Sequence, residues 1–322
     1  MPIENPARTG TAALVGRYAR LVKYKFVLDF LLALVVVATA LGPAALADPV
    51  TLTVLLLFVV GMLGVLAAVM TLDDVTGLKD GSDTENYLRV PDTALRPVKR
   101  KPLLTGELTV DQAQRFGYAG LIWGALWWAA AIAVSPHKEP WVLAVTVLLI
   151  TTSVQYSWGL KLSYHGLGEA TLLFSASAFV IAPYGLATGE LPVLVLVQGL
   201  LFGFGQLMIS GYSNTNDIPG DSAVGRRTAA VVLSERGNRV FLGLLTAANL
   251  LVVLAPAAVG AIPWWFAAAV LPFMALRTAQ YAGFLRTGDP LPARSKGIAA
   301  FRVVVLCTVV ANVAAHAAGW PF

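Results

Sequence analysis

The sequence is poor in the residues on which soluble and secreted proteins depend. Only 13% of its 322 residues are charged, whereas soluble domains average about 25%. Its single cysteine, Cys307, lies in an apolar run, so an internal disulfide is excluded and the redox compartment cannot be inferred. The three histidines, His137, His165 and His316, have no ligand spacing with Cys307 or with one another, so a zinc site is not expected.

Long apolar runs, in contrast, are abundant, and 57% of the residues are hydrophobic. A window of about 20 apolar residues is long enough to cross a bilayer as a helix. Such windows predict an all-α, polytopic membrane protein with nine transmembrane helices around a central cavity, and residues 1–322 as a single membrane domain. The predicted helices lie near 26–47, 50–72, 114–135, 140–159, 167–187, 191–213, 239–260, 262–285 and 298–319.

The basic residues are distributed unevenly among the links between these helices. Of the 23 lysines and arginines, 22 lie on what would be one side of the membrane, and only Lys138 lies on the other. Cytoplasmic loops carry such an excess, which predicts a multi-pass protein of the cell membrane with a cytoplasmic N-terminus and the C-terminus outside. The segment 1–25 and two candidate active-site loops, 73–113 and 214–238, are then cytoplasmic. Because orientation explains the net charge of +5, no nucleic-acid partner is expected.

Acidic clusters follow two of the predicted helices. Desolvating an unpaired carboxylate at a membrane boundary costs several kcal/mol, so both clusters need water or a cation. Mg²⁺ prefers oxygen ligands and usually joins one or two carboxylates to substrate phosphates, which makes it the expected cofactor. The candidate metal ligands are Asp73, Asp74, Asp80 and Asp83 in the first cluster and Asp217 and Asp221 in the second.

The spacing within each cluster suits a shared helix face. Asp217 and Asp221 are four residues apart, although Pro219 between them requires a helix start or an irregular turn. Asp73 and Asp80 are seven apart and share a face if the helix continues beyond the apolar run. Gly77 makes that continuation uncertain.

Basic residues follow each cluster, in the stretch 96–101 and at Arg226 and Arg227. They are either ordinary cytoplasmic anchors or partners of a diphosphate, which arginine can bind with two hydrogen bonds. Tyr156, at a predicted cytoplasmic helix end, is a further catalytic candidate that would orient the leaving group. The candidate diphosphate-binding residues are Asn214, Lys99, Arg100, Lys161, Arg226 and Arg227.

At these residues the sequence resembles the UbiA-type intramembrane prenyltransferases. The stretch from Asn214 to Asp221, with Gly-Arg-Arg-Thr at 225–228, is similar to the family's second aspartate-rich motif and its basic tail. Lys-Pro-Leu-Leu-Thr-Gly at 101–106 is similar to the family's Arg-Pro-Leu-x-x-Gly. Tyr156 and the loop that follows it resemble the menaquinone-branch enzymes.

The first motif departs from the family pattern Asn-Asp-x-x-Asp. Asp73 stands where asparagine is usual, Asp74 matches, and Gly77 replaces the next aspartate. Asp83 matches the final aspartate of longer-spaced variants, and Asp80 could supply the missing carboxylate from one turn away.

The resemblance implies a prenyltransferase that transfers a prenyl group from an isoprenyl diphosphate to a small aromatic or quinonoid acceptor within the lipid bilayer. Asp74, Asp217, Asp221 and Tyr156 are then the catalytic candidates. One alternative is a terpene cyclase of the same fold, which ionises and cyclises the diphosphate without an acceptor. The other is a transporter or lipid-binding protein that has lost catalysis.

Several other polar and aromatic residues have a structural and a functional interpretation. Gln206 and Asn249 would by default form helix–helix hydrogen bonds, although Gln206 could face the cavity. Asp29, in the first helix, is either functional or paired with Lys25. Tryptophans at 123, 127, 128, 264 and 265 are expected in the interfacial belt rather than beside a carbocation.

Overall fold

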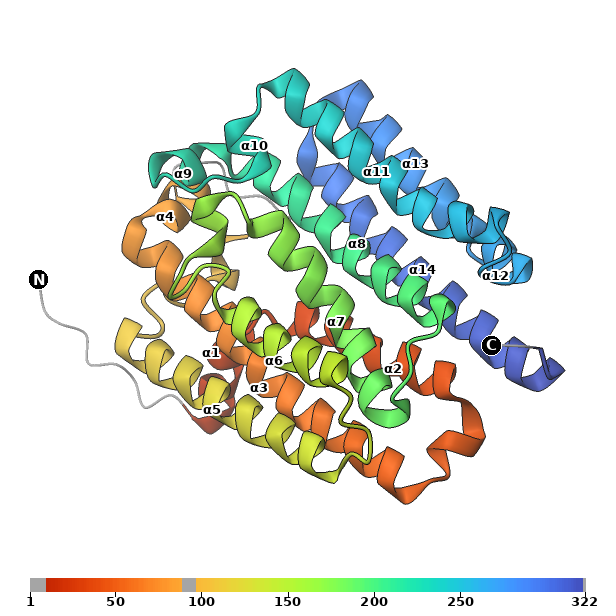
Figure 1. The fold of residues 1–322 in the computed structure, drawn as a ribbon. Coiled ribbons are helices and arrows are strands. Elements are labelled where there is room, and N and C mark those ends of the chain that lie inside the picture. The colour runs from red at the N-terminus through yellow and green to blue at the C-terminus, as the bar shows by residue number, and fades with distance from the viewer. Residues whose placement is uncertain (1–9, 89–96, 321–322) are drawn as a thin grey trace, which may run out of the picture.

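A computed structural model of the protein describes residues 10–88 and 97–320. The described residues form helices and no strands, and most long helices run alongside one another (Figure 1). The α-helices are α1 (Thr11–Leu21), α2 (Tyr24–Leu46), α3 (Pro49–Asp80), α4 (Ser82–Tyr87), α5 (Val110–Val134), α6 (Pro140–Val154), α7 (Gly168–Thr188), α8 (Val193–Asn216), α9 (Ile218–Ala223), α10 (Ala229–Val232), α11 (Glu235–Ala258), α12 (Trp264–Ala269), α13 (Leu271–Thr287) and α14 (Pro290–Ala318). Two short 3₁₀ turns, η1 (Val98–Arg100) and η2 (Leu162–His165), lie in the links.

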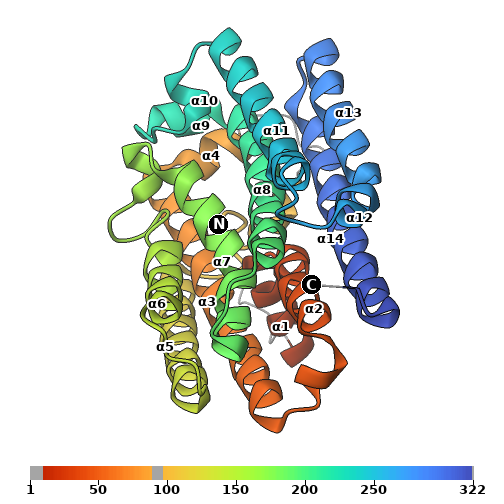
Figure 2. The same cartoon turned by 45° about the vertical axis from the view of Figure 1, so that its right-hand side comes forward.

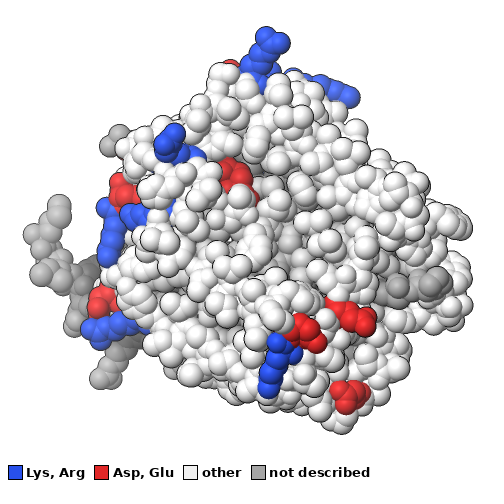
Figure 3. All heavy atoms as spheres, in the orientation of Figure 1, with Lys and Arg blue, Asp and Glu red and all other residues white. Residues whose placement is uncertain are grey.

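Seven of these helices are long and apolar enough to cross a membrane, namely α2, α3, α5, α7, α8, α11 and α14. On the face drawn in Figure 3, charged side chains gather toward the upper left and the lower right, with a broad uncharged surface between them. The all-helical, multi-pass prediction is therefore confirmed. The count of nine remains a prediction, because α6 has only 15 residues and the predicted helix 262–285 is divided into α12 and α13. Pro272 in the first turn of α13 cannot continue the hydrogen bonding across that division.

The central helices are α7 and α8, which the other helices flank on both sides (Figure 2). On one side, α3 and α5 pack so closely that a Cβ added at Gly64 would lie 2.6 Å from the carbonyl oxygen of Gly120. Small residues allow membrane helices to approach in this way. On the other side, α14 contacts α8, α2 and α13. This arrangement leaves α2, α3, α7 and α8 around a common interior.

The first acidic cluster lies on helices rather than in a loop, with Asp73, Asp74 and Asp80 on α3 and Asp83 on α4. The predicted helix 50–72 continues as α3 to Asp80 and ends at Gly81, whose φ of +88° is a conformation that favours glycine. The predicted loop 73–113 therefore starts too early, since the acids end the apolar run without ending the helix. A further helix, α1, lies in the predicted N-terminal segment. Residues 89–96, including Arg96 of the basic stretch, lie outside the described residues.

The second cluster lies where α8 gives way to α9. Asp217 is the junction residue, and Pro219 falls in the first turn of α9, where its missing N–H breaks no helical bond. The short helices α4 and α9 lie side by side at one end of the molecule (Figures 1 and 2). The backbone N–H of Gly220 donates a 3.1 Å hydrogen bond to Oδ1 of Asn86. This contact brings the ends of α3 and α8 together.

Candidate active site

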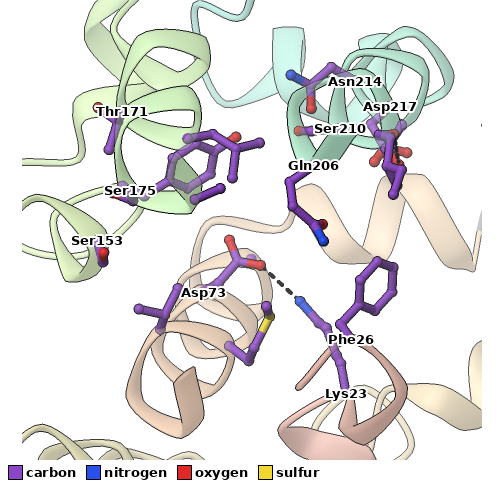
Figure 4. Close-up of a pocket in the computed structure, with 18 of the residues that line it drawn as sticks. Lys23, Phe26, Asp73, Ser153, Thr171, Ser175, Gln206, Ser210, Asn214 and Asp217 are labelled. Carbon is purple, nitrogen blue, oxygen red and sulfur yellow. Dashed lines mark hydrogen bonds and ion pairs between the residues drawn. The ribbon is translucent and has the colours of Figure 1, made fainter. Parts of the chain in front are cut away.

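Both acidic clusters open into one cavity that α2, α3, α7 and α8 surround. Asp73 and Asp83 line it from the first cluster, and Asp217 and Asp221 line it from the second. Figure 4 shows Asp73 on α3 and Asp217 at the end of α8. Lys23 extends upward from the lower part of the view to Asp73, and a dashed line marks their contact. The structure thus brings together carboxylates that lie far apart in the sequence.

Two lysine ammonium groups are bound within the first cluster. Lys23 Nζ lies 3.0 Å from Asp73 Oδ2 and 2.9 Å from Asp74 Oδ1. Lys101 Nζ lies 2.8 Å from Asp74 Oδ1 and 2.8 Å from Asp83 Oδ2. Burial alone would lower the pKa of Lys101, but the carboxylates of Asp74 and Asp83 raise it above its ordinary value. The same balance raises the pKa of Lys23, so both ammonium groups stay charged.

Asp83 occupies the space that a side chain at position 77 would take. A Cβ built on Gly77 would lie 2.8 Å from Asp83 Cγ and 2.8 Å from Asp83 Oδ2. The carboxylate that the family motif places on residue 77 is therefore replaced in space by a carboxylate six residues later. Burial raises the pKa of Asp83, against the lowering effect of Lys101.

Asp80 has a different role from its neighbours. Its Oδ2 accepts a short hydrogen bond from the Tyr164 hydroxyl, and its Oδ1 accepts one from the backbone N–H of Ser82 at 3.0 Å. Tyr164 in turn accepts a 3.3 Å hydrogen bond from Arg226 Nη2, whose guanidinium lies 4.9 Å from the tyrosine ring centre. Asp80 therefore links the end of α3 to the arginine of the second cluster.

The second cluster is arranged around Arg226 and the end of α8. Arg226 Nη1 lies 3.8 Å from Asp221 Oδ1, and Asp217 Oδ1 accepts a 3.1 Å hydrogen bond from Asn216. Burial alone would lower the pKa of Arg226, but Asp73 and Asp221 raise it, so this residue is a permanent cation between the two clusters. Asn214 lines the cavity and donates a 3.2 Å hydrogen bond to Glu169.

Not every predicted site residue reaches the cavity. Tyr156, Arg100, Asn214 and Arg226 line it, together with the four carboxylates already named. Asp74 is fully buried beneath the two lysines. The predicted residues that are not among the described residues lining the cavity are Asp74, Asp80, Lys99, Lys161 and Arg227.

The cavity-lining residues that sequence reasoning did not select include the charged and amide side chains of Lys23, Asn86, Lys101 and Arg294. Lys101 had a usable signal, because it opens the Lys-Pro-Leu-Leu-Thr-Gly segment that resembles the family motif. Lys23 was counted only as an orientation residue. Arg294 donates a 2.7 Å hydrogen bond to Ser213 from α14, a contact across 81 residues that no local pattern indicates.

Below the clusters the cavity wall is largely apolar. It includes Leu66, Val69 and Met70 of α3 and the rings of Phe26, Phe30 and Phe179. None of the five tryptophans in question is among the described residues that line the cavity. Trp264 is 77% exposed at the molecular surface, in agreement with a belt position. Trp128 is buried and stacks on Phe58, so the belt expectation is wrong for Trp128, which packs in the core.

Two other expectations are resolved by direct contacts. Asp29 pairs with Arg302 of α14, with Nε 2.9 Å from Oδ1, so the expected pairing with Lys25 is wrong. The local spacing favoured Lys25, but tertiary packing places a guanidinium beside the carboxylate instead. Asn249 accepts a 3.0 Å hydrogen bond from Arg277, as expected for a helix–helix contact.

The donor set fits Mg²⁺ held together with a phosphate ligand. The cavity offers carboxylate oxygens from both clusters, and these are the ligands that Mg²⁺ prefers. Within residues 10–88 and 97–320, no group of three or more acidic, histidine or cysteine side chains could hold a metal ion. Substrate phosphate oxygens would therefore have to complete the coordination, as is usual for Mg²⁺.

Comparisons with known proteins agree with the fold. A UbiA homolog from Archaeoglobus fulgidus, bound to DMAPP and Mg²⁺, has a TM-score of 0.65 at 16% identity, covering 92% of this chain and 98% of that one. A digeranylgeranylglyceryl phosphate synthase structure gives 0.61 at 14% identity, with coverages of 93% and 99%. An apo UbiA homolog from Aeropyrum pernix K1 gives 0.58 at 16% identity, with coverages of 88% and 96%.

These likenesses establish the fold. No curated protein matches the sequence. The sequence model of the UbiA prenyltransferase family, however, matches residues 31–317, which is most of the chain. The protein is therefore a member of the UbiA prenyltransferase family and a prenyltransferase by class.

Proposed function

We propose that the protein transfers a prenyl group from an isoprenyl diphosphate to a small aromatic or quinonoid acceptor, with Mg²⁺ as cofactor. The observation that carries the proposal is the single cavity with carboxylates and cations at one end and an apolar interior beyond them. The structural neighbour from Archaeoglobus fulgidus binds DMAPP and Mg²⁺ on the same fold. A diphosphate head and a hydrocarbon tail match the two ends of this cavity.

The polar end would bind the diphosphate and stabilise its departure. Asp73, Asp83, Asp217 and Asp221 are the residues that would hold Mg²⁺, and the bound metal supplies charge stabilisation for the leaving group. Arg226 and Arg100 would bind the phosphate oxygens that the metal leaves free. Preorganised cations of this kind lower the barrier because negative charge grows on the diphosphate as the C1–O bond breaks.

The phenol of Tyr156 would bind the departing oxygens as a hydrogen-bond donor. Burial raises its pKa above the ordinary value for tyrosine, so the group keeps its proton. Lys99, Lys161 and Arg227 are the weaker diphosphate candidates, because they do not line the cavity. We assign Asp74 and Asp80 to positioning, since Asp74 holds both lysines and Asp80 holds Tyr164.

The apolar wall would protect the allylic cation from water until the acceptor carbon attacks it. The aromatic faces of Phe26, Phe30 and Phe179 add stabilisation of positive charge. With the orientation that the basic residues predict, the polar end faces the cytoplasm and the C-terminus lies outside.

The deciding experiment supplies isoprenyl diphosphates of several chain lengths with Mg²⁺, with and without a phenol or hydroquinone, to the purified protein. We expect diphosphate release that requires both Mg²⁺ and the acceptor, and a product in which the prenyl group is bonded to a ring carbon. Cyclic hydrocarbons formed without acceptor would replace the proposal with a terpene cyclase. An intact diphosphate under all conditions would support the non-catalytic alternative.

A further inference from the structure

One polar side chain that lines the cavity has a nitrogen atom without a hydrogen-bond partner among the described residues. Gln206 of α8 is only 4% exposed, lines the cavity, and has an amide nitrogen, Nε2, without a partner among the described residues. Figure 4 shows its amide extending from α8 toward the space between Asp73 and Lys23. Buried polar groups are almost always hydrogen-bonded, so this donor points to a ligand.

A second glutamine on the same helix shows how a structural glutamine is satisfied. Gln198 is 2% exposed and donates a 2.8 Å hydrogen bond from Nε2 to Asn312 Oδ1, and it accepts one from Asn312 Nδ2 at 3.2 Å. Gln198 is not among the described residues that line the cavity. Hydrogen bonds between helices therefore account for Gln198. They do not account for Gln206, because its amide nitrogen has no partner among the described residues.

Hydroxyl groups line the same cavity as Gln206, from α8 and from the neighbouring α7. Ser210 lies one turn along α8, and Thr171 and Ser175 lie one turn apart on α7, so each pair shares a helix face toward the cavity. The hydroxyls of Ser175 and Thr152 share a 3.3 Å hydrogen bond. The opposite wall, from α2 and α3, is apolar below Lys23 and Asp73, and we call this part the hydrocarbon wall. The wall from α7 and α8 is mixed, because Leu172, Ala176 and Ile209 line the cavity beside these hydroxyls.

We infer that Gln206 donates a hydrogen bond to an oxygen of the acceptor and thereby positions the acceptor in the cavity. This inference rests on the proposed function and assigns to it a residue for acceptor binding. An isoprenyl tail has no atom that could accept this bond, so a site built only for the tail would leave the amide unpaired. A ring oxygen satisfies it and aligns the ring beside the hydrocarbon wall.

The assignment agrees with the chemistry of the transfer. The C1–O bond of the isoprenyl diphosphate breaks with its electron pair remaining on the diphosphate, and a ring carbon then forms the new bond to C1. The ring carbon loses its proton to the departing diphosphate, which restores the aromaticity of the ring, so no oxidant or reductant is needed. An oxygen substituent donates electron density to the ring, which makes its carbon a better nucleophile, and Gln206 fixes the position of that oxygen.

The test compares two probes of similar shape, 1-naphthol and 1-methylnaphthalene, which differ in their oxygen. Their affinities for the full-length protein are measured by equilibrium dialysis with Mg²⁺ and geranyl thiolodiphosphate, an analogue that does not ionise readily. We expect the wild type to prefer the naphthol by roughly two- to tenfold, the contribution of one hydrogen bond. The variant Gln206→Met should lose this preference and bind the thiolodiphosphate as the wild type does.

The matched control is Gln198→Met on the same helix, which should lower the melting temperature and keep the preference for the naphthol. A second variant, Gln206→Leu, tests the same contact if Gln206→Met does not fold. A preference that survives in the folded Gln206 variant, or its absence in the wild type, overturns the inference. Weaker thiolodiphosphate binding in the Gln206 variant also overturns it, because the amide would then serve the diphosphate. Failure of the wild type to bind the thiolodiphosphate at all removes the proposed function, and the inference with it.

Discussion

The two acidic clusters have similar charges and different surroundings. In the first, Asp73, Asp74 and Asp83 hold two lysine ammonium groups at 2.8–3.0 Å. In the second, the guanidinium of Arg226 lies 3.8 Å from Asp221. The first cluster therefore has much of its negative charge neutralised by the protein itself. The first cluster is therefore an internally paired support built on two lysines, whereas the second cluster is arranged around Arg226.

The largest effect should come from removing the cation inside the first cluster. Lys101→Met leaves Asp74 and Asp83 buried without their shared partner, and breaking a buried pair in this way costs about 3–5 kcal/mol of folding free energy. Thermal unfolding in detergent measures the loss. The control is Lys99→Met, since Lys99 is exposed and should change the free energy by less than about 0.5 kcal/mol. An equally stable Lys101→Met protein would contradict the internal pairing.

The second cluster should show its importance in catalysis. Asp221→Asn removes a charge from the diphosphate end of the cavity, and we expect kcat/KM to fall by about 10²–10³. Asp83→Asn should lower kcat/KM by only about tenfold, which corresponds to the loss of one charge-assisted hydrogen bond. The control is Asp111→Asn, because Asp111 forms an exposed ion pair with Arg115 away from the cavity. This variant should keep the wild-type kcat/KM. Equal losses at 83 and 221 would show that the clusters are equivalent.

Asp83 of the first cluster occupies the space that a side chain at position 77 would take. Gly77→Asp places a carboxylate where Asp83 already lies, and Asp83 cannot move easily because Lys101 contacts both of its oxygens. We expect a loss of about 1–3 kcal/mol in stability from the overpacking. The double variant Gly77→Asp, Asp83→Gly should regain most of the lost stability, and it should also regain diphosphate release. Independent, additive effects in this double-mutant cycle would contradict the replacement of one carboxylate by the other.

These relations explain how far sequence reasoning could go. The apolar runs identify most long helices, because length and hydropathy are local properties. The spacing of Asp217 and Asp221 likewise identifies the second cluster, and both line the cavity. The first cluster was harder, because the position of Asp83 beside Gly77 depends on the turn at Gly81. Lys23 and Arg294 come from other helices, and only tertiary packing brings them to the cavity.

The smallest effect should come from the contact that joins the two clusters. The Tyr164 hydroxyl donates to Asp80 and accepts from Arg226, so Tyr164→Phe removes two hydrogen bonds and keeps the ring beneath the guanidinium. We expect a few-fold rise in KM for the isoprenyl diphosphate, because Arg226 loses one restraint while it keeps Asp221.

Burial raises the pKa of Tyr164 to about 12, so the phenol keeps its proton at neutral and mildly alkaline pH. The contribution of this neutral form is present below that pKa and is lost only as the pH rises through it. The ratio of wild-type to Tyr164→Phe KM should therefore stay constant across the neutral range. A ratio that changes with pH there would mean that the link between the clusters titrates with the substrate, and that the clusters are coupled more tightly than their contacts indicate.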